Sequence, residues 1–290
     1  MRLQSALVFA AMLIVSCSGC GRSPEGNSTP APIDSENAPA SEGSRTAAPI
    51  IQTSADADSP NRILDPRADE VLRAMAAFLT KSKAFAFEAE ERFDEIPSGQ
   101  PRTLLSNVRR VGVQRPNKFA ADADGDTLSR SVWFDGQTFS VFDRTQNVYA
   151  NVSMPGSIDM ALDTLAEKYG VDVPLADLLY NDPYTILTGE VTYSRYLGLH
   201  LAAGVLCHHL VFSQPTIEWQ IWIDAGDQPF VRQLAISYVR EPGEPQYVAT
   251  LRKWRLLDAL PDDLFRFEPP EGAQRVDAQS LVPQLPGEPE

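Results

Sequence analysis

Cysteine is scarce in this sequence, and its placement excludes a disulfide-stabilised fold. Only three cysteines occur in 290 residues, and two of them, Cys17 and Cys20, lie among the first twenty. Cys207 therefore has no second cysteine with which to pair in the body of the chain, so the stability of the folded part must come from its core. The apolar run at residues 3–15 is too short to span a bilayer.

Positive charge is also scarce. Lys and Arg number 25 against 39 Asp and Glu, which gives a formal net charge of −14 that is spread along the chain. Binding to nucleic acid and electrostatic docking on anionic lipid both need basic patches, so this balance argues against both. An ordinary acidic, soluble surface is the simpler interpretation.

Sequence signatures of catalysis are missing as well. The Gly-x-Ser-x-Gly, phosphate-loop and His-Glu-x-x-His patterns do not occur. The Asp-rich run at residues 122–126 has Thr127 and Trp133 where a calcium loop needs Gly and Glu, so it predicts a hairpin turn. His208 and His209 are neighbours on a predicted strand, so they point to opposite faces and cannot chelate one ion together. We expect no catalytic residue, no cofactor and no metal site, and we do not expect an enzyme.

The first twenty residues are typical of a secretory signal, because Arg2 precedes the apolar run and small residues follow it. Ile14-Val15-Ser16-Cys17 resembles the lipobox of bacterial lipoproteins, in which the cysteine thiol receives a diacylglyceryl group and cleavage occurs just before it. The resemblance implies a signal peptide at residues 1–16 and lipidation of Cys17. Lipidation of Cys20 is one alternative, and an ordinary cleaved signal with two incidental cysteines is another.

A lipid anchor implies a place in a bacterial cell envelope, on its periplasmic side. The residue after Cys17 is Ser18 and the residue after Cys20 is Gly21, so neither cysteine is followed by Asp. In the enterobacterial sorting scheme this implies the outer membrane rather than the inner membrane.

Composition divides the rest of the chain into three segments. Residues 17–62 are rich in Ser, Pro and Ala, and residues 23–61 hold no aromatic side chain. Such a segment cannot bury enough apolar surface to offset an ordering entropy of about 1–2 kcal/mol per residue, which predicts a disordered tether. Residues 63–273 are long enough for one well-buried domain, and residues 274–290, with three prolines, predict a flexible tail.

The domain is predicted to begin with a helix and to continue in strands. Asp65-Pro66 supplies an N-cap and a first-turn proline, and apolar residues between 71 and 79 form a helical stripe. Alternating runs separated by turn signals about 8–12 residues apart indicate an antiparallel meander. The predicted strands lie at residues 85–90, 104–114, 118–123, 131–134, 139–142, 148–152, 192–201, 206–212, 217–224, 231–240 and 246–254, with helices predicted at 157–170 and 174–180.

The predicted strand at residues 217–224 has the densest one-sided apolar face of the chain. Ile217, Trp219, Ile221 and Ile223 share one face, whereas Gln220 and its alternate neighbours share the other. In the first predicted strand, Phe85 and Phe87 alternate in the same way.

Three runs carry a resemblance to a known superfamily. The run PDDLFRFEPPEG at residues 261–272 resembles the P-x-x-L-F-x-F-x-P-P-x-G ending of the LolA-like superfamily of periplasmic lipid and lipoprotein carriers. The runs CHHLVF at residues 207–212 and WQIWI at residues 219–223 are similar to one branch, an uncharacterised family of predicted periplasmic proteins. The resemblance covers most of residues 65–272.

The resemblance implies a mainly β (α+β) fold. We expect a curved antiparallel sheet that forms an unclosed half-barrel of about ten or eleven strands, with helices packed into its concave face. In the carriers, that concave face holds acyl chains.

Two functions are therefore open. The first is a membrane-anchored envelope lipoprotein whose half-barrel binds a hydrophobic ligand, either an acyl chain or a lipoprotein, with Phe85, Phe87, Trp219, Ile221 and Ile223 lining the site. The second is a structural or regulatory lipoprotein that acts through protein–protein contact, its apolar faces forming an ordinary core. In both cases the expected partners are the membrane, through the lipid anchor, and a ligand or protein, but not nucleic acid.

Overall fold

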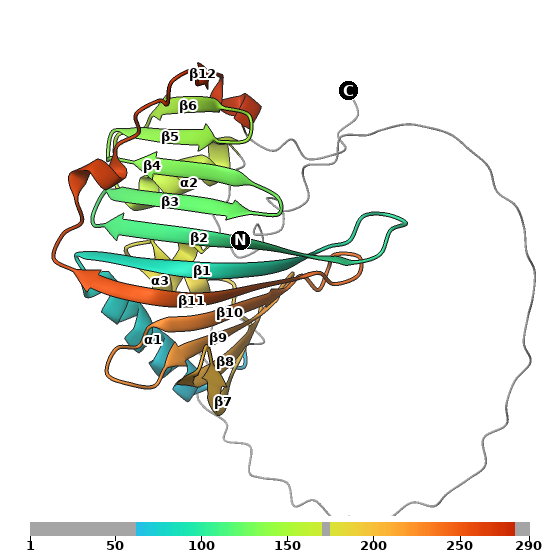
Figure 1. Ribbon diagram of the computed structural model, residues 1–290. Helices are drawn as coiled ribbons and strands as arrows, with labels where there is room; N and C mark the ends of the chain where they lie inside the picture. The colour runs from blue at the N-terminus through green and yellow to red at the C-terminus, as the bar shows by residue number, and fades with distance from the viewer. Residues whose placement is uncertain (1–61, 170–174, 282–290) are drawn as a thin grey trace, which may run out of the picture. The chain divides into compact units, whose positions relative to one another are not determined.

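The computed structural model describes residues 62–169 and 175–281, and the candidate lipidation sites Cys17 and Cys20 lie outside this range. The described residues form one twelve-stranded sheet with three α-helices (Figure 1). The strands are β1 (Ala84–Glu95), β2 (Thr103–Gln114), β3 (Lys118–Gly125), β4 (Ser129–Phe134), β5 (Thr138–Asp143), β6 (Val148–Ser153), β7 (Tyr193–Ala202), β8 (Val205–Ser213), β9 (Glu218–Asp224), β10 (Val231–Ser237), β11 (Gln246–Leu257) and β12 (Gln274–Arg275).

The sheet is built almost entirely from antiparallel hairpins. Its order is β12-β6-β5-β4-β3-β2-β1-β11-β10-β9-β8-β7, and β12, which pairs with β6, makes the one parallel pairing among the named strands. The first strand lies near the middle of the sheet because β1 pairs with both β2 and β11. Since β12 and β7 are the two edges and do not pair with each other, the sheet is unclosed.

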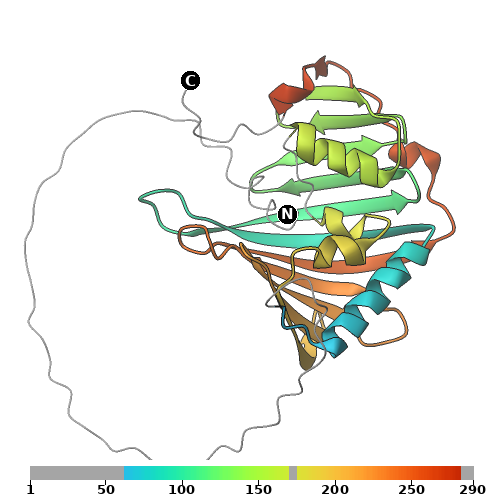
Figure 2. The same ribbon diagram turned by 180° about the vertical axis from the view of Figure 1, so that it is seen from behind.

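Three helices cover one face of the sheet, as Figure 2 shows: α1 (Pro66–Lys81), α2 (Ile158–Tyr169) and α3 (Pro183–Thr188). The α1 helix starts where the sequence predicts, because Pro66 takes the first helical position and the Asp65 carboxylate accepts a hydrogen bond from the Arg67 backbone N–H at 2.9 Å. In its apolar stripe Leu72, Met75 and Leu79 are fully buried, and Val71 and Phe78 are half-buried.

Strand alternation decides which side chains meet the helices. Phe85 and Phe87 in β1 face them and are buried, whereas Ala86 and Glu88 face the opposite side. We call these the helix-covered face and the outer face of the sheet. The buried side chains of the helix-covered face and of all three helices form one hydrophobic cluster.

The predicted fold class is confirmed: the protein is mainly β, with an unclosed, largely antiparallel sheet and few helices. Eleven of the strands match the predicted runs, and the twelfth, β12, is a pair of residues too short to show an alternating pattern. Together with a 3-10 turn at Ala278–Leu281, β12 belongs to the first part of the predicted tail. No helix in the two described stretches is long and apolar enough to cross a membrane.

The connection between α2 and β7 was predicted less well. Of the helix predicted at residues 174–180, a 3-10 turn at Ala176–Leu178 is present, and the next helix is instead α3. The α3 signal was visible in the sequence: Asp182 caps it by accepting from the Thr185 backbone N–H, and Pro183 stands at its first position.

Candidate ligand-binding site

The five predicted ligand-lining residues all lie on the helix-covered face. Phe85 and Phe87 belong to β1, and Trp219, Ile221 and Ile223 belong to β9, with β11 and β10 between the two strands. None is more than 3% exposed, and all five belong to the same hydrophobic cluster. The structure thus joins the two groups through the core but does not place them in direct contact.

Aromatic rings fill the space around both groups. The ring of Trp254 in β11 lies 5.9 Å from that of Phe85 and 4.6 Å from that of Phe87. At the other end of the face, Trp219 stacks on Phe212 of β8, with centroids 4.0 Å apart and planes 15° apart.

Trp219 differs from Trp254 in its hydrogen bonding. The Nε1–H group of Trp254 donates to the Val231 carbonyl at 2.9 Å. The Nε1 atom of Trp219 is buried and has no hydrogen-bond partner among the described residues. An unsatisfied buried donor costs about 1–3 kcal/mol and calls for an explanation, such as a ligand that accepts from it.

A strip of half-buried apolar side chains extends the same face toward β6. Val132 of β4 lies directly opposite Val141 of β5 in the register, and Val152 of β6 lies opposite Phe139. Together with Leu105 of β2, these side chains pack against the buried cluster while keeping part of their surface exposed. We call Leu105, Val132, Val141 and Val152 the accessible strip.

The helix-covered face also holds a buried polar cluster. Arg109 of β2 donates to both carboxylate oxygens of Glu91 in β1, at 2.7 and 3.2 Å, and the Tyr247 hydroxyl donates to Glu91 Oε1 at 3.0 Å. Burial, followed by the charge of Glu91, raises the pKa of Tyr247 well above its ordinary value, so this hydroxyl stays protonated. A mostly apolar surface with a few fixed polar groups is typical of a site for small molecules.

One arginine ties the helices to the sheet. Arg115, just after β2, donates to the carbonyls of Leu179 and Tyr180 at 2.9 and 3.0 Å and to the Asn181 side chain at 3.0 Å. It therefore fixes the segment before α3 over the end of β2.

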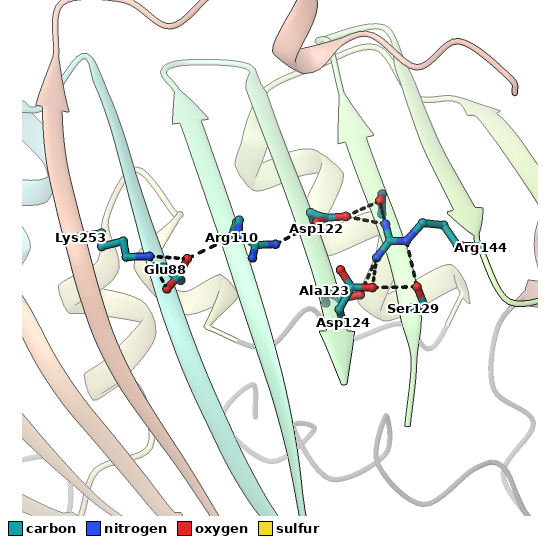
Figure 3. Close-up of polar contacts among 9 residues, drawn as sticks. Glu88, Arg110, Asp122, Ala123, Asp124, Ser129, Arg144 and Lys253 are labelled. Atoms are coloured by element: carbon teal, nitrogen blue, oxygen red, sulfur yellow. Dashed lines mark hydrogen bonds and ion pairs between the residues drawn. The ribbon is translucent and has the colours of Figure 1, made fainter. Parts of the chain in front are cut away.

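The outer face presents a ladder of charges instead of an apolar surface (Figure 3). Lys253 Nζ lies 3.0 Å from Glu88, whose second oxygen lies 3.4 Å from Arg110 Nε. The ladder continues from Arg110 to Asp122 at 3.4 Å and on to Arg144, which contacts Asp122. Because its charges pair with one another and such exposed pairs contribute about 0–1 kcal/mol each, the ladder indicates a solvated face rather than a charged-ligand site.

A hollow of about 600 Å³ lies beside this ladder. Gly112 forms part of its floor, and Leu260 and Leu264 from the segment after β11 form one wall. A Cβ atom on Gly112 would come within 3.0 Å of Leu264, so the absence of a side chain there lets the segment rest on the sheet. The hollow is a second candidate ligand-binding site, after the helix-covered face.

Neither cysteine nor histidine forms a reactive centre among the described residues. Cys207 is buried, and burial, followed by the charge of Asp224, raises the pKa of its thiol, which keeps it protonated. His209 is on the outer face and His208 on the helix-covered face, where the Tyr196 hydroxyl contacts its Nδ1 at 3.0 Å. Within the described ranges, no three His, Cys, Asp or Glu side chains gather in a way that could hold a metal ion.

Sequence reasoning missed the accessible strip and the buried polar cluster. The strip could have been predicted, because Val132 is two residues from Phe134 and Val141 is two residues from Phe139, so each pair shares one face of its strand. Strand alternation places Glu91 on the face of Phe85 and Phe87, opposite Glu88 and Glu90, but only strand pairing brings Arg109 to it.

Comparison with known proteins now assigns the family. The model of a family described as "Predicted periplasmic protein (DUF2092)" matches residues 68–279. The chain belongs to this family. The match confirms the uncharacterised branch that the CHHLVF and WQIWI runs indicated. Among curated protein sequences, none matches this chain.

The chain is also similar to solved structures from several bacteria, all at low identity. Lipoprotein LppX of Mycobacterium tuberculosis is 16% identical, with a TM-score of 0.38 and coverage of 66% of this chain and 96% of that one. LprF of Mycobacterium bovis is 13% identical, with a TM-score of 0.43 and coverage of 72% and 98%. A LolA superfamily protein of Nitrosomonas europaea is 11% identical, with a TM-score of 0.33 and coverage of 69% and 97%.

Proposed function

We propose that this protein is an envelope lipoprotein that binds a hydrophobic ligand on the helix-covered face of its sheet. The observation that carries the proposal is the buried indole N–H of Trp219, which lies in an apolar face and has no hydrogen-bond partner within residues 62–169 and 175–281. A ligand that joins an acyl chain to an ester or amide carbonyl would cover the apolar surface and accept this hydrogen bond. Both a lipid and the lipid-modified end of a lipoprotein have this chemistry.

The accessible strip is where such a ligand would first lie. Phe85, Trp219 and their partners are too deeply buried to touch a ligand unless a helix moves, whereas Val132 and Val141 are half-buried and already partly exposed. The apolar chain of the ligand would follow the strip. Leu105 of β2 is the member of the strip nearest to Trp219 and lies four strand pairings away, across β1, β11 and β10, so the carbonyl would reach Trp219 after a displacement of the helices that opens this width.

The deep burial of the five predicted lining residues favours a second candidate. Side chains that are 3% exposed or less also describe an ordinary solid core. In that case the protein would be a structural or regulatory envelope lipoprotein that acts through contact with another protein, and it would bind no acyl chain.

A fluorescent fatty-acid analogue separates the two candidates when it is titrated into the full chain. Wild type is expected to bind saturably. Val141→Asp should weaken binding at least about tenfold, because it places a charge among apolar side chains where the ligand lies. Val211→Asp is the matched control, since Val211 is a half-buried valine on the outer face of the same sheet.

Circular dichroism must show that both variants are folded. A folded wild type without saturable binding would contradict the ligand proposal, as would equal losses in Val141→Asp and Val211→Asp. Native mass spectrometry after gentle purification provides a second readout, because a retained lipid adds a defined mass.

A further inference from the structure

The turn between β7 and β8 is apolar and exposed, which is unusual for a hairpin. Residues 199–206 read Leu-His-Leu-Ala-Ala-Gly-Val-Leu, with no charged side chain. Leu199, Leu201 and Leu206 are 48%, 73% and 49% exposed. We call residues 199–206 the apolar hairpin tip.

Other hairpins of the same sheet end in polar residues. The β9–β10 turn, at the same end of the sheet, contains Asp227 and Gln228, and the β1–β2 turn contains Ser98, Gln100 and Arg102. Polar turn residues are the norm because turns are solvated and their side chains bond to the turn backbone. The composition of the apolar hairpin tip therefore needs a reason other than turn formation.

Backbone geometry points the same way. Ala203 and Gly204 both have positive φ, 51° and 77°. A two-residue turn with positive φ at both places favours Asn or Asp at the first place and Gly at the second. Ala203 takes that first place, where the positive φ strains an alanine. The tip therefore has an apolar residue at a position that a polar one would fit better.

The three leucines form one surface on the helix-covered face. Leu201 lies directly opposite Leu206 in the register, and Leu199 lies opposite His208, two residues before Leu201. Helix α1 starts beside the beginning of β7, where the Asp65 carboxylate accepts from the Tyr196 backbone N–H at 2.8 Å, and it ends just before β1. It crosses the sheet from β7 toward β1 instead of following β7 to the tip, where the three leucines are exposed.

The chain also enters the domain beside β7. The Ile63 backbone N–H donates to the Thr192 carbonyl at 2.9 Å, and Ile63 pairs with Tyr193 at the start of the strand. The 61 residues that precede Arg62 include the predicted lipidation sites Cys17 and Cys20. Ile63 lies beside the start of β7, at the end of the strand away from the tip. A tether raises the effective concentration of the whole domain at the membrane, so even a small apolar surface on it can engage lipid.

We propose that the apolar hairpin tip inserts its leucines into the surface of the phospholipid bilayer to which the predicted lipid anchor attaches the chain. The contact is hydrophobic rather than electrostatic, since the protein has a net charge of −14 and the tip itself carries no charge. It goes beyond ligand binding on the helix-covered face and does not depend on it. It orients the domain on the membrane with the β7 edge toward the lipid.

Lipid quenching of a fluorescent amino acid tests the contact. The label is introduced into the full chain at position 203, in the tip, or at position 100, in the turn at the opposite end of the sheet. The protein is mixed with vesicles of zwitterionic phosphatidylcholine whose acyl chains are brominated. Quenching at position 203 should exceed that at position 100 several-fold and should persist at high salt.

Leu201→Asp should reduce the quenching at position 203 to the level seen at position 100. Leu104→Asp is the matched control, because Leu104 is 64% exposed at the start of β2, and it should leave the quenching unchanged. Equal quenching at the two labels overturns the proposal, as does quenching that survives Leu201→Asp. Cross-linking of two chains through position 203 without lipid quenching also overturns it, because the tip would then join two copies. The fatty-acid titration is read separately, so failure of either proposal is recognised on its own.

Discussion

Trp219 places a polar group, its indole N–H, within the apolar face of β9. Its place in the alternating run with Ile221 and Ile223 correctly predicted which face of the strand it occupies. That its indole N–H lacks a partner among the described residues could not be predicted, because the acceptors near the indole are known only once the chain is folded. The same holds for Glu91, whose pairing with Arg109 depends on the register of β1 and β2.

Trp219→Phe tests the role of the indole N–H. The substitution keeps an aromatic ring on Phe212 but removes the buried donor, so the affinity for an ester-containing lipid should fall by about 3–10-fold, the equivalent of about 1 kcal/mol. The affinity for a hydrocarbon probe without a carbonyl should change less. Isothermal titration of both ligands measures the two affinities. If Trp219→Phe reduces both affinities equally, Trp219 contributes only packing.

At the scale of elements, strand alternation and helix capping predicted most of the structure. The eleven longer strands and α1 fall where periodicity and the Asp65-Pro66 cap place them, because these signals are local. The α3 helix was missed because its six residues are too few for a helical stripe. The short β12 exists only through its pairing with β6, which no local signal encodes.

The β7–β8 hairpin should make stability depend on pH. The Nδ1 atoms of His200 and His209 lie 2.9 Å apart, and His209 Nε2 lies 2.9 Å from the Gln220 side-chain oxygen. One proton between the two Nδ1 atoms makes a hydrogen bond, whereas a proton on each would repel. Burial lowers the pKa of His209, and burial also lowers that of His208, so the folded state favours the neutral rings.

The sign of the pH dependence follows from these lowered pKa values. The unfolded chain binds protons more readily than the folded one once the pH falls below about 6.5, the ordinary histidine pKa. The stability is therefore fully present above that pH and is lost as the pH falls toward the folded pKa values. Between about pH 7.5 and 5, the melting temperature of His209→Gln should fall less than that of wild type. Equal falls in melting temperature would show that His209 does not cause the pH dependence.

At the scale of the whole molecule, the family assignment and the sheet say more about the domain than about its place in the cell. The family is one of predicted periplasmic proteins, and both proposed contacts, the ligand on the helix-covered face and the lipid at the hairpin tip, fit a domain held near a membrane. What holds it there is predicted from the first twenty residues alone, since Cys17 and Cys20 lie outside the described residues. The anchor is thus the part of the functional picture that rests on sequence chemistry and needs its own test.

Metabolic labelling with an alkynyl fatty acid supplies that test. Cys17→Ala should abolish or strongly reduce the label, because Ile14-Val15-Ser16-Cys17 fits the lipobox at all four places, whereas Cys20→Ala should leave most of it. Label that survives Cys17→Ala and disappears in Cys20→Ala would move the lipid to Cys20. Wild type without any label would contradict the lipoprotein prediction, and the hairpin tip would then have to engage lipid without the high effective concentration that a tether provides. Two or more acyl chains on one cysteine, at about 0.8 kcal/mol for each buried methylene, would instead make the attachment lasting and leave the tip to set the orientation.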